Sequence, residues 1–474
     1  MISDAEIAWS SLSAQRTLLK ERSISSTELV QIYRDRINSL DDSLRAYITI
    51  CDVAADARAR TLDEARETSG KPNGLWGIPL AVKDQMAIEN VRVTGGSHLF
   101  RERIPTFDAT VIARLRSADA ILLGTLNTME FHMAGTRVFP FGTPRNPWDL
   151  TRTPGGSSCG SGIAVAAGLC SAALGADTGG SIRLPASMCG ITGLKPTWSR
   201  VSRFGVNTHV WSMDCVGPMA RSAEDCALLL DVLGGHDHLD PTSSHRTMPQ
   251  SCDYLNGSIN GVRIGLVSEA MEVAEASTQE AVALVLETLA GLGAKVTKVS
   301  LPMVQETRFV TPVVVDSEAA SYHRSRLIHE SEGLDRNTRV RLLVGSCIPA
   351  GLQTLAARAR AAMARQVLHA LESVDILVGP TCPGGAGLIA DPPVITSHTE
   401  ATSLLYGRGR AEGTAIYSMA GVPAITVPCG FDTNRMPLGC HLAGRYFDEP
   451  LLLRVAHAYQ LATDWHTRRP KLLA

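Results

Sequence analysis

The chain has 474 residues, of which 45% are hydrophobic and 19% are charged, and its formal net charge at pH 7 is −2. This length and composition predict a soluble globular protein with a large core. The near-zero net charge, with no basic run longer than WHTRRPK near the C-terminus, gives no support to nucleic acid or an anionic membrane as a partner.

Targeting and membrane signals are not expected in this sequence. The N-terminal stretch MISDAEIAWSSL carries acidic residues and no apolar core, so no signal peptide is predicted. No stretch approaches 18 uninterrupted apolar residues, and the longest candidate, GIAVAAGLCSAALGA, is interpreted as a buried core helix. The 11 cysteines contain no CxxC motif and no metal-type spacing, which favours reduced core thiols in a cytoplasmic protein over disulfides.

In chain order, the first predicted element is a helix that begins at SSTE, residues 25–28, a capping-box pattern. Leu29, Tyr33, Ile37 and Leu40 then follow at helical spacing. Five apolar runs bounded by Gly or Pro are predicted as buried strands: GIPLAV, ADAILLGT, VRIGLV, DILVGPT and PAITVPCG.

Helical stretches alternate with these strands, for example EAVALVLETLAGLG and EPLLLRVAHAYQLATDW. Helices that alternate with short, continuous apolar strands predict an α/β layered fold with a largely buried sheet. Residues 305–370 are the least strand-like part of the chain. We interpret them as a helical segment with polar interruptions that forms a lid or an insertion.

The first chemical motif is TPGGSSCGSG at residues 153–162. Its GSSCG matches the G-x-S-x-G nucleophile elbow with Ser158 as the nucleophile, but that elbow needs a preceding strand, and RNPWDLTRTPG is a proline-broken loop. A phosphate loop is disfavoured because no G-K-[ST] follows. A capping turn at a helix N-terminus explains the motif equally well.

The second motif is ADTGGSIRLPA at residues 176–186. Its glycines allow consecutive backbone N–H groups to point at one position, which is how an oxyanion hole is built. Ser181, at the end of this turn, is placed to attack a carbonyl carbon whose oxygen lies in that hole. A tight turn without chemistry is the alternative.

A nucleophilic serine needs a base, and no histidine lies in or between the two motifs. His98, His132 and His441 have no convincing local context and are interpreted as ordinary polar contacts. GIPLAVKDQM places Lys83 directly after an apolar strand, where burial lowers the pKa of a lysine, and Ser–Lys catalytic pairs are known. Pairing of Lys83 with Asp84, or an exposed ammonium, is the alternative.

Taken together, GIPLAVKD, PGGSSCGS and ADTGGSIRLPASMCGITGLKPT closely resemble the motifs of the amidase signature family. The flanks SSTELVQIYRDRINSL and AGVPAITVPCGF agree, and the resemblance is weakest at about 305–370. It implies one large domain over 1–474, with a core at about 70–230, a C-terminal part at 370–465 and a variable segment at about 305–370. The implied fold is a twisted mixed β-sheet covered by helices on both faces.

The resemblance also implies a Ser–cis-Ser–Lys triad. Ser181 would be the nucleophile, Ser157, entered through a cis Gly156–Ser157 peptide bond, would relay the proton, and Lys83 would be the base. The implied oxyanion hole consists of the N–H groups of Thr178, Gly179, Gly180 and Ser181.

Ser158, Asp177 and Arg183 are implied as supporting residues around this triad. Cys159 stands where the family usually has Gly or Ser, and it is small enough to be tolerated. No metal or organic cofactor is expected, because no cluster of His, Cys and carboxylates has metal-type spacing and no dinucleotide fingerprint follows a strand.

The leading functional hypothesis is a stand-alone serine hydrolase that cleaves C–N bonds of small amides, with carbamates and esters as further substrates, through an acyl-enzyme. The alternative is a glutaminase A subunit of a tRNA-dependent amidotransferase. Leu184, where those A subunits tend to carry Gln, and the lack of a basic run count against it. An α/β-hydrolase that uses Ser158 and a catalytically inactive binding protein are the remaining, less favoured hypotheses.

Substrate specificity is expected from residues 305–370 and 384–417. Apolar side chains there predict a partly apolar pocket: Phe309, Tyr322, Leu404, Leu405, Tyr406 and Tyr417. Alternatively, Arg324, Arg408 or Arg410 would hold a substrate carboxylate. The expected partner is a small amide or carbamate, and a second copy in a homodimer is the protein partner left open.

Overall fold

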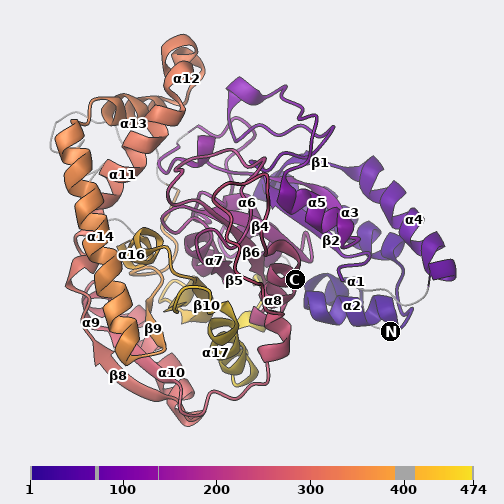
Figure 1. Cartoon of the computed structure of the whole chain (residues 1–474). Coiled ribbons are helices and arrows are strands. Elements are labelled where there is room, and N and C mark those ends of the chain that lie inside the picture. The colour runs from indigo at the N-terminus through magenta and orange to yellow at the C-terminus, as the bar shows by residue number, and fades with distance from the viewer. Residues whose placement is uncertain (1–2, 70–73, 137, 390–411, 472–474) are drawn as a thin grey trace.

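The strands of the chain form one mixed sheet. The computed structural model describes residues 3–69, 74–136, 138–389 and 412–471 (Figure 1). Within these residues the sheet has eleven strands in the order β1-β3-β2-β4-β6-β5-β10-β11-β9-β7-β8. The strands are β1 (Tyr47–Ile50), β2 (Pro79–Lys83), β3 (Ile121–Leu126), β4 (Ala172–Asp177), β5 (Thr192–Lys195), β6 (Cys215–Ala220), β7 (Arg263–Val267), β8 (Lys295–Val299), β9 (Ile376–Pro380), β10 (Ala424–Phe431) and β11 (Pro437–Ala443).

Helices flank this sheet. They are α1 (Asp4–Trp9), α2 (Leu12–Lys20), α3 (Ser26–Leu44), α4 (Asp52–Ser69), α5 (Thr110–Ser117), α6 (Cys159–Ala166), α7 (Arg183–Cys189), α8 (Ala223–Leu233), α9 (Ser268–Glu272), α10 (Ala276–Gly291), α11 (Thr307–Tyr322), α12 (Arg324–His329), α13 (Arg336–Ser346), α14 (Ala350–Ser373), α16 (Glu412–Ala420) and α17 (Glu449–Leu461). In Figure 1 the helices α1 to α4 lie at one end of the molecule and α11 to α14 at the other. The chain therefore has the predicted α/β fold, a mixed sheet flanked by helices.

The parallel pair β2 and β4 positions the site. Leu80 lies opposite Ala172 and Val82 opposite Leu174 in their register. Because parallel neighbours end at the same edge of a sheet, the last residue of β2, Lys83, lies near the turn that follows β4. The two motifs that are far apart in the sequence thus meet at one sheet edge.

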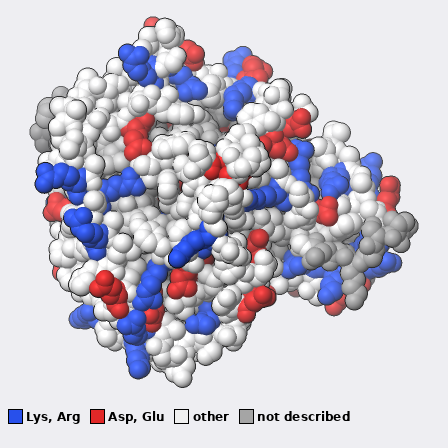
Figure 2. Space-filling view, in the orientation of Figure 1, with Lys and Arg blue, Asp and Glu red and all other residues white. Residues whose placement is uncertain are grey.

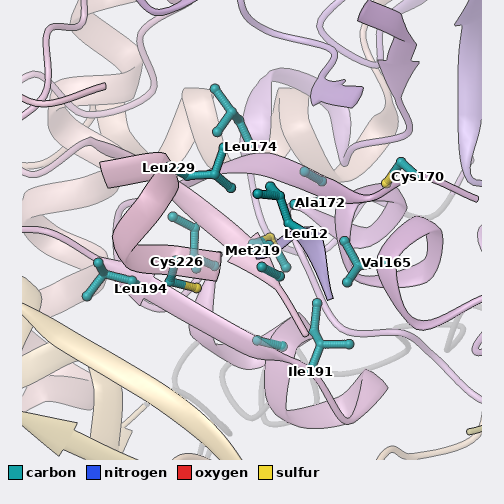
Figure 3. Close-up of a cluster of buried hydrophobic side chains, with 14 of the residues drawn as sticks. Leu12, Val165, Cys170, Ala172, Leu174, Ile191, Leu194, Met219, Cys226 and Leu229 are labelled. Carbon is teal, nitrogen blue, oxygen red and sulfur yellow. The ribbon is translucent and has the colours of Figure 1, made fainter. Parts of the chain in front are cut away.

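A buried apolar cluster fixes these strands (Figure 3). Side chains from β4, β5 and β6 pack there against α2, α6 and α8, and include Leu12, Val165, Leu174, Leu194, Met219 and Leu229. Cores of this kind are packed as densely as organic crystals. We therefore expect little freedom in the strand ends that carry the two motifs.

Several predicted elements are confirmed. The Ser25 side chain accepts a hydrogen bond from the Glu28 N–H, and the Glu28 side chain accepts one from the Ser25 N–H, so the capping box begins α3. The five predicted strands correspond to β2, β3, β7, β9 and β10, and the two predicted helices correspond to α10 and α17. Residues 305–370 are mainly helical, as α11 to α14.

The predicted core helix GIAVAAGLCSAALGA is wrong over its second half. Helix α6 ends at Ala166, and Gly168 has a φ of +66°, a left-handed conformation that glycine adopts without steric cost. The Ser171 N–H then donates to the Pro79 carbonyl at 3.0 Å, and β4 follows. Alanine favours helices in isolation, but pairing with β2 and β6 overrides that preference here.

Two further expectations concern membranes and cysteines. Among the described residues no single helix is long and apolar enough to cross a bilayer; α13 and α14 reach that length and composition only as a pair bent by 97°. None of the 11 cysteines forms a disulfide, and eight of them are buried. The predicted free core thiols are thus observed, and the cytoplasmic location stays a prediction.

Candidate active site

Lys83 and Ser157 are in direct contact. Lys83 ends β2, its side chain is fully buried, and its Nζ donates hydrogen bonds to Ser157 Oγ at 2.7 Å and to the Ala176 carbonyl at 3.5 Å. Asp84, the alternative partner, instead accepts from the Thr94 N–H at 3.0 Å. Among the described residues Lys83 forms no ion pair, so its nitrogen is available to the serine.

The environment of Lys83 favours its neutral form. Burial lowers the pKa of Lys83 from 10.5 to about 7, and the nearby Cys159, Asp214 and Asp177 oppose that shift only in part. A free lysine is almost entirely protonated at pH 7. With a pKa of about 7, about half of the Lys83 side chains are neutral at that pH. A neutral amine that hydrogen-bonds to a hydroxyl is able to take the hydroxyl proton.

The backbone around Ser157 has the conformation that the resemblance implies. The Gly156–Ser157 peptide bond is cis. The Ser157 carbonyl accepts hydrogen bonds from Thr128 Oγ1 at 3.0 Å and from the Met129 N–H at 3.4 Å. The segment after β3 thus holds Ser157 opposite Lys83.

Ser158 joins the two motifs. Its N–H donates to the Ser181 carbonyl at 3.2 Å, and its Oγ donates to the Ala176 carbonyl at 3.1 Å. The hydrolase hypothesis that made Ser158 the nucleophile is wrong, because the described residues 138–158 contain no strand and the side chain of Ser158 is fully buried. Ser181, in contrast, is partly exposed at the end of its turn.

A buried ion pair shapes the turn after β4. Both oxygens of Asp177 receive hydrogen bonds from the Arg183 guanidinium, at 2.9 and 3.0 Å, and both side chains are inaccessible to solvent. Burial raises the pKa of Asp177, but the charge and hydrogen bonds of Arg183, together with the Lys195 charge and the Ile182 N–H, outweigh burial and lower that pKa to about 2. Asp177 and Arg183 therefore lie where supporting residues were expected.

Only three of the four N–H groups predicted to form the oxyanion hole lack a hydrogen-bond partner among the described residues. The Gly180 N–H donates to Asp177 Oδ1 at 2.8 Å, so Gly180 differs from the expectation, and at a φ of +141° it shapes the turn instead. The N–H groups of Thr178, Gly179 and Ser181 have no hydrogen-bond partner among the described residues. Those three donors are the ones open to a substrate oxygen.

The histidines singled out in the sequence lie in different places. His441 Nε2 lies 3.0 Å from Arg183 Nη1, and His132 Nδ1 lies 3.2 Å from Thr128 Oγ1, while His98 is exposed. The first two are polar contacts, as expected. Sequence reasoning missed Thr128 and His209, since neither stands in a motif or at a telling spacing.

The residues predicted to determine substrate specificity also lie in different places in the structure. Phe309 and Arg324 are exposed, and Tyr417 is buried with its ring 4.9 Å from that of His441. Tyr322 Oη donates to Asn207 Oδ1 at 3.5 Å. The remaining candidates lie outside the described residues: Leu404, Leu405, Tyr406, Arg408 and Arg410.

Charges on the surface are mixed. Figure 2 shows Lys and Arg side chains spread over this face with acidic side chains among them. Within the described parts of the chain, no group of three or more His, Cys, Asp or Glu is arranged to hold a metal ion. That no cofactor is needed stays a prediction.

Comparison with known proteins matches residues 28–453 to the family described as Amidase. A curated relative, the A subunit of the glutamyl-tRNA(Gln) amidotransferase from Roseiflexus sp. (strain RS-1), is 38% identical over 97% of this chain and 98% of its own length. The relatives thus include amidotransferase A subunits. That is the alternative function considered above, and Leu184 is the residue that counts against it.

Solved structures extend the likeness to other activities. One, from a vestigial protein complex that reveals the origins of an s-triazine catabolic enzyme, is 31% identical with a TM-score of 0.89 and covers 98% of this chain and 100% of its own. The peptide amidase of Stenotrophomonas maltophilia is 29% identical with a TM-score of 0.82 and covers 97% of this chain and 98% of its own.

Proposed function

The chain belongs to the amidase signature family, and we propose that it is a serine hydrolase that cleaves C–N bonds of small amides through an acyl-enzyme on Ser181. The observation that carries this proposal is the 2.7 Å hydrogen bond from Lys83 Nζ to Ser157 Oγ. A fully buried lysine with a pKa of about 7 is suited to proton transfer near neutral pH.

Acylation follows from this arrangement. The substrate carbonyl oxygen accepts hydrogen bonds from the N–H groups of Thr178, Gly179 and Ser181. Ser181 Oγ bonds to the carbonyl carbon and gives its proton to Ser157 Oγ, while the Ser157 proton passes to Lys83 Nζ. The C–N bond breaks as a proton returns by the same route to the leaving nitrogen.

Deacylation repeats these steps with water as the nucleophile. Water bonds to the acyl carbon and gives its proton through Ser157 to Lys83. The ester bond to Ser181 breaks, Ser181 Oγ regains a proton, and the carboxylic acid leaves. Carbamates and esters enter the same cycle, because they present the same carbonyl to the three N–H donors.

A second candidate is the glutaminase A subunit of a tRNA-dependent amidotransferase. It is favoured by the names of the curated relatives and by their identity over nearly the whole chain. Leu184, whose N–H donates to the Gly180 carbonyl at 2.7 Å beside the turn, is the residue that counts against it. The same cycle would then release ammonia from glutamine.

Substrate choice belongs to the variable segment in our proposal. We assign it to residues 305–370, which form α11 to α14, together with 384–417. The division into a core at about 70–230 and a C-terminal part at 370–465, the homodimer and the cytoplasmic location are kept as predictions.

The experiment that separates the two functions uses the purified chain alone. We expect it to hydrolyse members of a panel of small amides, carbamates and esters, and Ser181→Ala to abolish that turnover. Hydrolysis of glutamine only, and only after further subunits of an amidotransferase are added, would establish the amidotransferase function instead.

A further inference from the structure

Four polar side chains, His132, Asn207, His209 and His323, each keep one buried atom without a hydrogen-bond partner among the described residues. The atoms are Nε2 of His132, His209 and His323, and Nδ2 of Asn207. The four residues are 3%, 5%, 0% and 9% exposed, respectively. Because most buried polar atoms in proteins are paired, each of these four atoms leaves a hydrogen-bonding position for a ligand or an ordered water.

Two of the histidines are attached to the catalytic turns. His132 contacts Thr128 Oγ1 at 3.2 Å, and that hydroxyl donates to the Ser157 carbonyl. His209 Nδ1 lies 3.4 Å from Thr178 Oγ1, in the predicted oxyanion turn. Both rings lie within electrostatic reach of Lys83, whose charge lowers the pKa of each after burial.

The other two residues are His323 and Asn207, and we call the set His132, Asn207, His209 and His323 the wall. The His323 ring lies 4.6 Å from the Phe131 ring and 5.0 Å from the Tyr322 ring. Tyr322 also holds Asn207 through its hydroxyl. The His323 charge further lowers the pKa of His132 and of His209, so His323 lies within electrostatic reach of both rings.

The contacts assign the proton on each ring. Thr178 Oγ1 donates its single proton to Asp214 at 2.6 Å, so it accepts from His209 Nδ1–H and leaves Nε2 of His209 as an acceptor. Thr128 Oγ1 donates to the Ser157 carbonyl and leaves Nε2 of His132 as an acceptor in the same way.

His323 has the opposite tautomer. Arg326 Nη1 lies 3.1 Å from His323 Nδ1, and since arginine only donates, Nδ1 accepts and Nε2 carries the proton. Nδ2 of Asn207 is a donor as well. The four atoms therefore present two acceptors and two donors.

The backbone supports a functional role for this wall. Phe131 has a φ of +45° and His132 a φ of +66°. Left-handed conformations are rare for residues with bulky side chains, and they persist mainly where a site requires them. Here they place the Phe131 ring against His323 and the His132 ring beside Thr128.

We propose that these four atoms bind a second, neutral carboxamide or ureido group of the amide substrate. This inference rests on the proposed function and names its substrate class. Such a group carries N–H donors for His132 and His209 and a carbonyl oxygen for His323 and Asn207. An alkyl group would leave all four atoms unpaired, and a carboxylate would face the lone pairs of His132 and His209.

The test is a matched series of substrates. Propanediamide, butanediamide and pentanediamide are each compared with the alkyl amide of the same shape (3-methylbutanamide, 4-methylpentanamide and 5-methylhexanamide) and with the corresponding monoacid. We expect kcat/KM to be about tenfold or more higher for the best diamide than for its alkyl partner, because hydrogen bonds left unpaired reject an analogue.

Two variants assign that preference to this wall. Asn207→Leu and His209→Phe should each lower the diamide-to-alkyl ratio of kcat/KM about tenfold, whereas His369→Phe, at an exposed position, should keep it. A ratio near one, a preference for the alkyl amide or the monoacid, or variants that leave the ratio unchanged would overturn the inference.

Binding to Ser181→Ala separates this inference from the proposed function. Calorimetry should show that the diamide binds more tightly than its alkyl partner and that Asn207→Leu removes the difference. If that holds while the unmodified chain cleaves no amide, the binding wall stands and the hydrolase proposal fails. If the chain cleaves alkyl amides without a preference for diamides, the hydrolase proposal stands and the binding inference fails.

Discussion

Lys83 Nζ lies 2.7 Å from Ser157 Oγ, although 74 positions separate the two residues in the chain. The parallel pairing of β2 with β4 and the hydrogen bonds of the Ser157 carbonyl to the segment after β3 bring them together. A buried lysine with a serine hydroxyl in reach is the feature from which the chemistry follows.

Replacement of Lys83 by arginine keeps a positive charge but removes the base that our proposal assigns to Lys83. Because arginine is not deprotonated at working pH, we expect Lys83→Arg to lower kcat/KM by about 10² to 10⁴, close to the effect of Lys83→Ala. Steady-state kinetics measure this, with folding checked by circular dichroism and with exposed Lys298→Arg as the control. A Lys83→Arg variant with most of its activity would make Lys83 a structural residue.

Lys83 also links stability to pH. Its pKa is about 7 in the folded chain and 10.5 in the unfolded one, so between these values the unfolded state binds more protons. The free energy of unfolding contributed by Lys83 therefore rises with pH from about 7 to 10.5. Denaturant titrations at several pH values should show this slope in the unmodified chain and a smaller one in Lys83→Met; equal slopes would contradict the lowered pKa.

The Asp177–Arg183 pair should be costly to break. Asp177→Asn leaves the Arg183 charge buried without its partner, and such changes destabilise by about 3–5 kcal/mol. Asp464→Asn, in a solvent-exposed pair with Arg468, should change the free energy of unfolding by about 0.5 kcal/mol or less. Similar losses in both variants, measured by denaturant unfolding, would argue against the role of the buried pair.

Gly160 has no room for a side chain. A Cβ there would lie 2.4 Å from the Ala46 carbonyl oxygen and 2.4 Å from the Asn127 nitrogen, both backbone atoms. We expect Gly160→Ala to destabilise by about 1–3 kcal/mol and to reduce activity, since α6 begins directly after Ser158. Gly351→Ala, with open space around its Cβ, should be neutral or stabilising by up to about 1 kcal/mol. Thermal unfolding of the two variants gives the comparison.

Strands that form continuous apolar runs between Gly or Pro could be predicted from the sequence, and β2, β3, β7, β9 and β10 are examples. Strands β5 and β6 were missed, because TGLK and CVGPMA are short and carry Gly, Pro or Lys. The alanines of β4 favour helix locally, so its sequence predicts a helix, and only its neighbours in the sheet make it a strand.

Ser181 and Lys83 could be named as candidates from the glycine-containing turn and from the lysine after an apolar strand, whereas Ser157 was implied only by the resemblance to the amidase signature family. Their mutual contact could not be predicted from periodicity, because it depends on strand order. The hydrogen bond that occupies the Gly180 N–H depends on the exact shape of its turn, and the residues His132, Asn207, His209 and His323 come from three separate segments of the chain. No local spacing signals such contacts.

The most direct test of the account is the pH dependence of Ser181 labelling by a fluorophosphonate. Tandem mass spectrometry must locate the adduct, because the tryptic peptide 153–183 also contains Ser157 and Ser158. We predict the adduct on Ser181, with a labelling rate that rises about tenfold per pH unit below the Lys83 pKa of about 7 and levels off above it. An adduct on Ser158, or a rate that does not change with pH, would contradict the account.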